Sequence, residues 1–124
     1  MAHTVVFVCP HGAGKSRVTA ALFEVAAGAG WQASSAGLEP QEQVSEHAVA
    51  LLADDAAGVL LDHSAPRRLT RAASGDVIVA IDCEVAGARR WTLTESWPGP
   101  AVREELRGLT AALAGELLGR RAVR

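Results

Sequence analysis

The chain contains little of several features that mark specialised classes of protein. Only two of its 124 residues are cysteines, Cys9 and Cys83, which is too few for a disulfide scaffold and favours a cytoplasmic protein. No apolar run approaches the roughly 18 residues that a membrane-spanning helix needs. The N-terminal MAHTVVFV lacks the basic leader and cleavage site of an export signal. The net charge of −2 creates no overall field, so we expect neither nucleic acid nor a membrane as a partner.

Lysine is scarcer still. The chain has eleven arginines and one lysine, Lys15, which lies in a glycine-rich stretch. A sequence so biased toward arginine would place arginine at an ordinary basic surface position. The single lysine therefore suggests that position 15 requires an ammonium group rather than any cation.

The remaining composition is that of a globular domain, with 49% hydrophobic and 21% charged residues and no repeat, low-complexity segment or linker. We predict one domain over residues 1–124. Strand-like and helix-like segments alternate along it. We expect strands at residues 5–8, 31–37, 76–82 and 90–93. We expect helices at residues 15–29, 46–58 and 69–73, and a last one beyond residue 100 with an apolar stripe.

Alternating strands and helices predict a three-layer α/β fold, with a four-stranded parallel sheet and helices on both faces. Ligands of such folds bind beyond the carboxyl ends of the strands. Cys9, Asp82 and Cys83 all fall at that edge, and so does the loop at residues 94–97. We therefore expect the functional site there.

The stretch VVFVCPHGAGKS, residues 5–16, has the features of an anion-binding loop. A loop between a strand end and a helix start directs successive amides, here those of residues 10–16, into one concavity, and the helix dipole adds positive potential. Gly12 and Gly14 allow the unusual dihedral angles that such a nest requires. A cysteine at its base favours the thiolate, because helix N-termini and nearby cations lower thiol pKa values from about 8.5 to ~3.5–7.5. Cys9 is thus a candidate nucleophile, and Ser16 could donate a hydrogen bond to its thiolate.

This stretch resembles the active-site loop of the low-molecular-weight protein tyrosine phosphatases and of the arsenate reductases that share their fold. Their signature is a cysteine, five residues and Arg-Ser at the end of the first strand. Further segments resemble the family in the right order, so the similarity covers nearly the whole chain: SSAG at 34–37, LDHSAPRRLT at 61–70, DVIVAID at 76–82 and WTLTESW at 91–97.

The resemblance implies a role for each matching residue. Cys9 attacks the phosphorus of a phosphomonoester, Lys15 stabilises the developing charge, Ser16 supports the thiolate and Glu95 is the general acid. The substrate-binding residues it implies are Pro10, His11, Gly12, Ala13, Gly14 and Trp97. Three positions depart from the family pattern: Lys15 replaces arginine, Gly12 replaces asparagine, and Glu95-Ser96 replaces Asp-Pro.

Two activities on this fold remain open. Trp97 falls where the phosphatases carry an aromatic residue that stacks on the substrate ring, which favours hydrolysis of a phosphotyrosine-type ester in a small molecule or protein. Lysine in the loop and glutamate at the acid position also occur in arsenate reductases that use a small-molecule thiol. An arsenate reductase would need such a thiol, a thiol-disulfide oxidoreductase, or Cys83 as a redox partner, although Cys83 is more simply a small buried residue. Neither activity needs a metal or another cofactor.

Two other interpretations also remain. Because of its three departures the loop could be a catalytically weak or inactive relic that still binds anions. Gly14-Lys15-Ser16 and the strand that ends at Asp82 also resemble parts of a P-loop nucleotide-binding protein, in which Cys9 would occupy the first glycine position.

Overall fold

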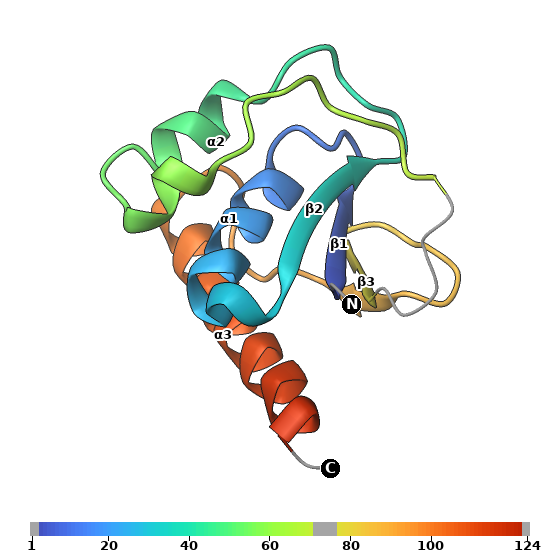
Figure 1. Ribbon diagram of the computed structural model, residues 1–124. Coiled ribbons are helices and arrows are strands. Elements are labelled where there is room, and N and C mark those ends of the chain that lie inside the picture. Colours follow the sequence, from blue (N-terminus) through green and yellow to red (C-terminus); the bar gives the residue numbers. More distant parts are fainter. Residues whose placement is uncertain (1–2, 71–76, 123–124) are drawn as a thin grey trace.

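The computed structural model describes residues 3–70 and 77–122, with the side chains of the last helix up to Gly119. Four parallel strands form one sheet in the order β2-β1-β3-β4. They are β1 (Thr4–Cys9), β2 (Gln32–Gly37), β3 (Val77–Ile81) and β4 (Arg89–Trp91). The apolar strands β1 and β3 lie in the middle and the more polar β2 lies at one edge, as their composition predicts (Figure 1). The predicted four-stranded parallel sheet is confirmed.

The α-helices are α1 (Lys15–Ala27), α2 (Glu46–Leu51) and α3 (Pro100–Ala122); η1 (Gly28–Gly30) and η2 (Ala56–Leu60) are 3₁₀ turns. α1 begins six residues after β1 ends, at the carboxyl edge of the sheet. α3 packs along α1 (Figure 1). The N-terminus of α1 therefore meets the ends of β1 and β3 at the predicted edge.

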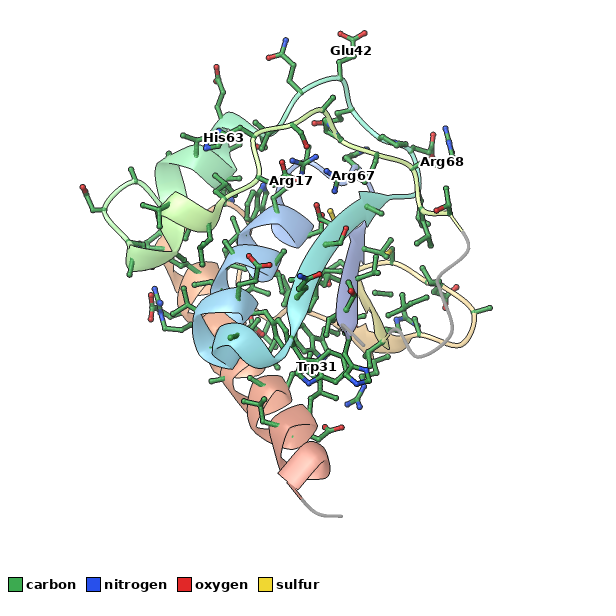
Figure 2. All side chains as sticks on the ribbon, in the orientation of Figure 1. Arg17, Trp31, Glu42, His63, Arg67 and Arg68 are labelled. Carbon is green, nitrogen blue, oxygen red and sulfur yellow. The ribbon has the colours of Figure 1, made fainter. Side chains whose placement is uncertain are left out.

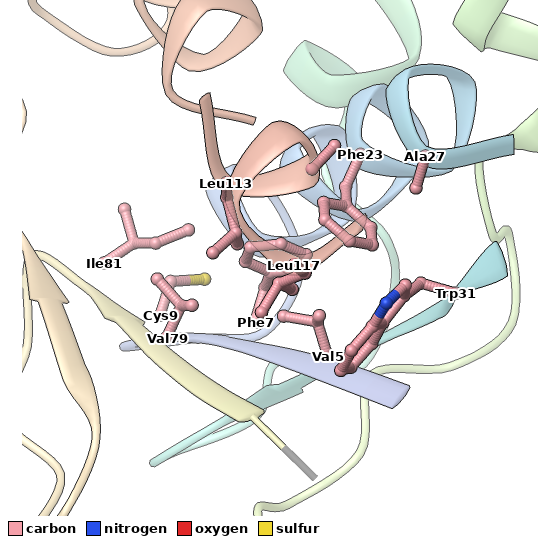
Figure 3. Close-up of a cluster of buried hydrophobic side chains, with 11 residues drawn as sticks. Val5, Phe7, Cys9, Phe23, Ala27, Trp31, Val79, Ile81, Leu113 and Leu117 are labelled. Carbon is pink, nitrogen blue, oxygen red and sulfur yellow. The ribbon is translucent and has the colours of Figure 1, made fainter. Parts of the chain in front are cut away.

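The core has two apolar clusters. In the first, α1 and α3 cover one face of the sheet, where alternate residues of β1 place Val5, Phe7 and Cys9 against Phe23 and Leu113 (Figure 3). In the second, α2 and η2 pack on the other side of α1. Cys9, the last residue of β1, belongs to this cluster and is only 3% exposed.

The structure departs from the predicted helices in two places. The run at 46–58 is divided into α2 and η2, because the Asp55 carboxylate accepts the Ala57 amide at 2.9 Å and starts a new turn. Gly58 then lies so close to Leu52 that an added Cβ would clash with the Leu52 carbonyl oxygen. Leu69 and Thr70 are not helical, and the rest of the predicted helix at 69–73 lies outside the described residues.

The prediction also placed helices on both faces of the sheet. In the described part of the chain, α1 and α3 pack on one face, whereas α2 and η2 pack on α1. The segment after η2 is extended and forms a parallel bridge with the edge strand β2 through Arg68 and Gly37. Within residues 3–70 and 77–122, no helix is long and apolar enough to cross a membrane.

Candidate active site

The loop of residues 9–16 is held close to the end of β2. Gly12 has φ +64°, a conformation that favours glycine. A Cβ added to Gly12 would lie 2.7 Å from the Gly37 nitrogen, and one added to Gly37 would lie 2.6 Å from the Gly12 nitrogen. The two glycines thus allow the backbones of the loop and β2 to touch. This contact gives a structural reason for the glycine of the SSAG segment.

The carbonyl groups of the loop are all engaged. Four of them accept amides of the chain at 38–45. The Cys9 carbonyl accepts the Leu38 amide at 3.4 Å, and the Pro10 carbonyl accepts the Glu39 amide at 2.8 Å. The His11 carbonyl accepts the Gln41 amide at 3.2 Å, and the Ala13 carbonyl accepts the Ser45 amide at 2.8 Å. The Gly12 carbonyl accepts Arg17 Nε at 3.1 Å. Every carbonyl from residue 9 to 13 therefore faces the surrounding protein.

The amides of residues 11–16 differ from these carbonyls, because none of them donates a hydrogen bond within the part of the chain that the structure describes. Because a trans peptide group places its N–H opposite its C=O, the outward carbonyls of residues 10–13 turn the amides of residues 11–14 inward, which is the arrangement of an anion-binding nest. One detail of the prediction is wrong: Pro10 has no amide hydrogen, so the nest begins at His11.

Cys9 and Ser16 face each other at the base of the nest. The Cys9 thiol donates to Ser16 Oγ at 3.2 Å, and Ser16 is fully buried. After loss of the thiol proton the hydroxyl becomes the only donor of the pair, so Ser16 would then stabilise the thiolate.

Lys15 is paired with a carboxylate. Its Nζ donates to Asp82 Oδ2 at 2.7 Å, and both side chains are about one-quarter exposed, at 24% and 23%. Burial favours the neutral form of Asp82, but the hydrogen bonds from Lys15 and the Leu93 amide outweigh it and lower the pKa of this carboxyl. The Asp82 carboxylate therefore stays ionised at neutral pH.

A pocket of about 410 Å³ lies over the loop. Trp97 forms one wall and touches the loop backbone, since a Cβ on Gly14 would meet its Cζ2 at 2.7 Å. The predicted residues that line the pocket are Cys9, Pro10, His11, Ala13, Gly14, Lys15 and Trp97, and three further residues, Gln41, Ser45 and His47, complete it. Gly12 and Ser16 are buried behind this surface. The structure thus brings most of the predicted site together.

Glu95, the predicted general acid, lies on an exposed segment and does not line this pocket. Its amide donates to Glu105 Oε1 at 2.9 Å, and the Thr94 amide and hydroxyl donate to the same carboxylate. The Thr94 amide is the main reason that the pKa of Glu105 is lowered. Glu105 therefore fixes the backbone beside Trp97, while the catalytic role of Glu95 stays a prediction.

Cys83 lies beside the end of β1. Its thiol donates to the Val8 carbonyl at 3.5 Å, and both cysteines are reduced. Burial, followed by the nearby Cys9, raises the pKa of Cys83, so this thiol stays protonated at neutral pH. Its role as a redox partner stays a prediction.

Arg17, two residues into α1, is buried next to the loop, where its Nε donates to the Gly12 carbonyl (Figure 2). Besides the Gly12 carbonyl, it donates to the Asp62 carbonyl at 2.7 Å, and Arg67 binds the Asp62 carboxylate at 2.7 Å. Arg17 therefore supports the nest from behind. No sequence pattern distinguished it from a surface arginine, just as none marked Gln41, Ser45 or His47.

No group of three His, Cys, Asp or Glu side chains able to hold a metal ion occurs in the described residues.

Comparison with known proteins is more informative. No match was found among curated proteins. Among solved structures, an arsenate reductase from Archaeoglobus fulgidus is 30% identical, with a TM-score of 0.72 over 90% of this chain and 98% of that one.

Two less similar structures share the fold. A thioredoxin-dependent arsenate reductase from Corynebacterium glutamicum is 23% identical, with a TM-score of 0.74 over 94% of this chain and 62% of that one. An arginine phosphatase from Geobacillus stearothermophilus is 20% identical, with a TM-score of 0.71 over 96% of this chain and 95% of that one.

The sequence profile of the low molecular weight phosphotyrosine protein phosphatases matches residues 4–96. Together with the geometry of the loop, this match shows that the chain belongs to the low molecular weight phosphotyrosine protein phosphatase family.

Proposed function

We propose that the protein hydrolyses phosphomonoesters through a phosphocysteine on Cys9. The observation that carries this proposal is that Cys9 lines one pocket with the loop whose amides, those of residues 11–16, have no hydrogen-bond partner in the described part of the chain. The three equatorial oxygens of a phosphoryl group would accept these amides while its phosphorus lies over the sulfur. The same nest would accept an arsenate oxyanion.

In the first step the Cys9 thiolate attacks phosphorus. The sulfur–phosphorus bond forms as the bond to the leaving oxygen breaks, and the amides stabilise the charge on the equatorial oxygens. We assign Glu95 as the acid that protonates the leaving group. In the second step water attacks the phosphocysteine, Glu95 takes its proton, and phosphate and the Cys9 thiolate are released.

The pocket supports an aryl ester as the substrate. Trp97 presents its indole beside the nest, where it can stack on an aromatic leaving group. A volume of about 410 Å³ lies within the range of small-molecule sites. We infer a phosphorylated small molecule or a phosphotyrosine side chain as the substrate. Since the reacting groups are all side chains, the mechanism requires no metal or organic cofactor, and the free Cys9 thiol fits a reducing cytoplasm.

The test is turnover of an aryl phosphate by the wild type, by Cys9→Ser and by Cys83→Ser, each without metal. We expect Cys9→Ser to abolish hydrolysis and still bind inorganic phosphate, because the nest is made of backbone. Cys83→Ser is the matched control, and its turnover should equal that of the wild type. Hydrolysis by Cys9→Ser at the wild-type rate would remove Cys9 from the mechanism.

The similarity to an arsenate reductase and the position of Cys83 favour a second candidate function, arsenate reduction. Cys9 would attack arsenic and displace one oxygen as water. A second thiol would then attack the Cys9 sulfur, so that arsenite leaves and two thiols are oxidised to one disulfide. That thiol is Cys83, a small-molecule thiol or a thiol-disulfide oxidoreductase. Arsenite release that requires an added thiol, in a protein without phosphatase activity, would favour this function.

A further inference from the structure

The pocket contains one Lys or Arg side chain among the described residues, and that side chain is already paired. Lys15 lines the pocket beside Cys9, yet its Nζ lies 2.7 Å from Asp82 Oδ2. A carboxylate at this distance cancels most of the attraction that the ammonium would offer to an entering oxyanion. The pairing therefore affects how strongly the site binds its ligand.

Asp82 is fixed more firmly than Lys15. Its backbone lies in the left-handed region, with φ 55°, and its amide donates to the Trp91 carbonyl at 2.9 Å. Its second oxygen, Oδ1, accepts the Leu93 amide at 2.9 Å. Lys15, by contrast, carries its charge on a flexible four-carbon chain. Of the two partners, Lys15 is the one that can turn toward a ligand in the pocket.

We propose that Asp82 sets the anion affinity of the site, because it competes with the bound oxyanion for Lys15. The inference rests on the proposed function only in that the nest binds an oxyanion. In the structure Lys15 is held by Asp82. When the anion binds, the ammonium must exchange the Asp82 oxygen for an oxygen of the ligand. For a hydrolase this competition weakens the binding of product phosphate and so favours its release.

The test is Asp82→Asn, with inorganic phosphate as the probe. Asparagine tolerates the left-handed backbone and its side-chain oxygen can still accept the Leu93 amide, so the substitution removes mainly the charge. Phosphate affinity is measured as protection of Cys9 from alkylation, in a Cys83→Ser background. We expect the dissociation constant for phosphate to fall about tenfold, the effect of one hydrogen bond to a charged group.

Two control variants isolate the role of Lys15. Glu84→Gln removes a carboxylate two residues away that pairs with Arg90 instead, and should leave phosphate affinity unchanged within about twofold. In a Lys15→Met background, Asp82→Asn should no longer tighten phosphate binding. An unchanged or weaker affinity in Asp82→Asn overturns the proposal. So does an equal gain in the Lys15→Met background, because Asp82 would then act as a general negative charge.

A second measurement uses the wild type and does not depend on the folding of any variant. Since Lys15 is the only lysine, its ammonium gives a single side-chain signal in nitrogen-15 NMR. During a phosphate titration this signal should shift in step with Cys9 protection, as the contact passes from Asp82 to phosphate. A signal that stays constant at saturating phosphate contradicts the proposal. Neither readout requires turnover. If the protein binds phosphate in this way but hydrolyses no ester, that result refutes only the proposed function.

Discussion

The contact between Gly12 and Gly37 predicts a large effect from one added methyl group. In Gly37→Ala, the new Cβ would lie 2.6 Å from the Gly12 nitrogen and from the His11 carbonyl carbon. These distances are about 0.8 Å shorter than an ordinary van der Waals contact. Both neighbours are backbone atoms, so no side chain can rotate away. The loop must therefore move relative to β2.

The size of that movement determines the expected loss. Overpacking of this kind costs about 1–3 kcal/mol of unfolding free energy. A displacement of nearly an ångström at a catalytic group reduces turnover by about 10²-fold. The outward hydrogen bonds of the loop would be strained as well, since the Leu38 and Glu39 amides that bind it follow Gly37 directly. We expect both stability and aryl phosphate turnover to fall in Gly37→Ala.

Urea unfolding and steady-state hydrolysis measure the two effects. The matched control is Gly115→Ala, at an exposed position of α3 where an added Cβ meets no atom within 4 Å. It should leave turnover unchanged and increase stability by up to about 1 kcal/mol, because alanine is the better helix former. Wild-type turnover and stability in Gly37→Ala would show that the loop does not depend on this contact.

Two further predictions follow from the hydrogen bonds of the site. Ser16→Ala removes the donor to the Cys9 thiolate, and we expect Cys9 alkylation at pH 7 to slow by about tenfold; an unchanged rate would exclude that role. Burial opposes ionisation of Asp62, but hydrogen bonds from Arg67 and Ser64 hold the pKa of its carboxyl well below the usual range. The ionised Asp62 carboxylate therefore adds about 1 kcal/mol or less, after screening, to the free energy of unfolding. This stabilisation is present above pH ~4 and is lost as the pH falls below that value. Urea unfolding should consequently show a smaller loss from pH 7 to pH 3 in Asp62→Asn than in the wild type.

The sequence predicted those parts of the site that depend on a local pattern. A buried strand that ends at Cys9, two glycines and a helix start at Lys15 define the nest without knowledge of distant contacts. The parallel sheet then brings Asp82 to the same edge, because the carboxyl ends of its strands coincide. These features, together with the order of the family segments, were sufficient to predict the fold and the place of Cys9 in the pocket, whereas its role as the nucleophile stays a prediction.

The rest of the site depends on tertiary contacts that no local pattern encodes. Whether Arg17 is buried or exposed depends on the distant Asp62, and the pairing of Lys15 depends on the left-handed backbone that Asp82 adopts after β3. His47 lines the pocket only because the chain at 38–45 folds over the loop. The helix predicted at 46–58 was too long because the capping oxygen of Asp55 competes with helix periodicity.

The most direct test of the account is to identify the residue that carries the phosphoryl group during turnover. The wild type is mixed with an aryl phosphate, quenched with acid at millisecond intervals, digested and analysed by mass spectrometry. The account predicts a transient phosphoryl group on the peptide that contains Cys9, at a level that matches the burst of released phenol. Hydrolysis with no phosphorylated Cys9 at any quench time, or with the group on another residue, would contradict it.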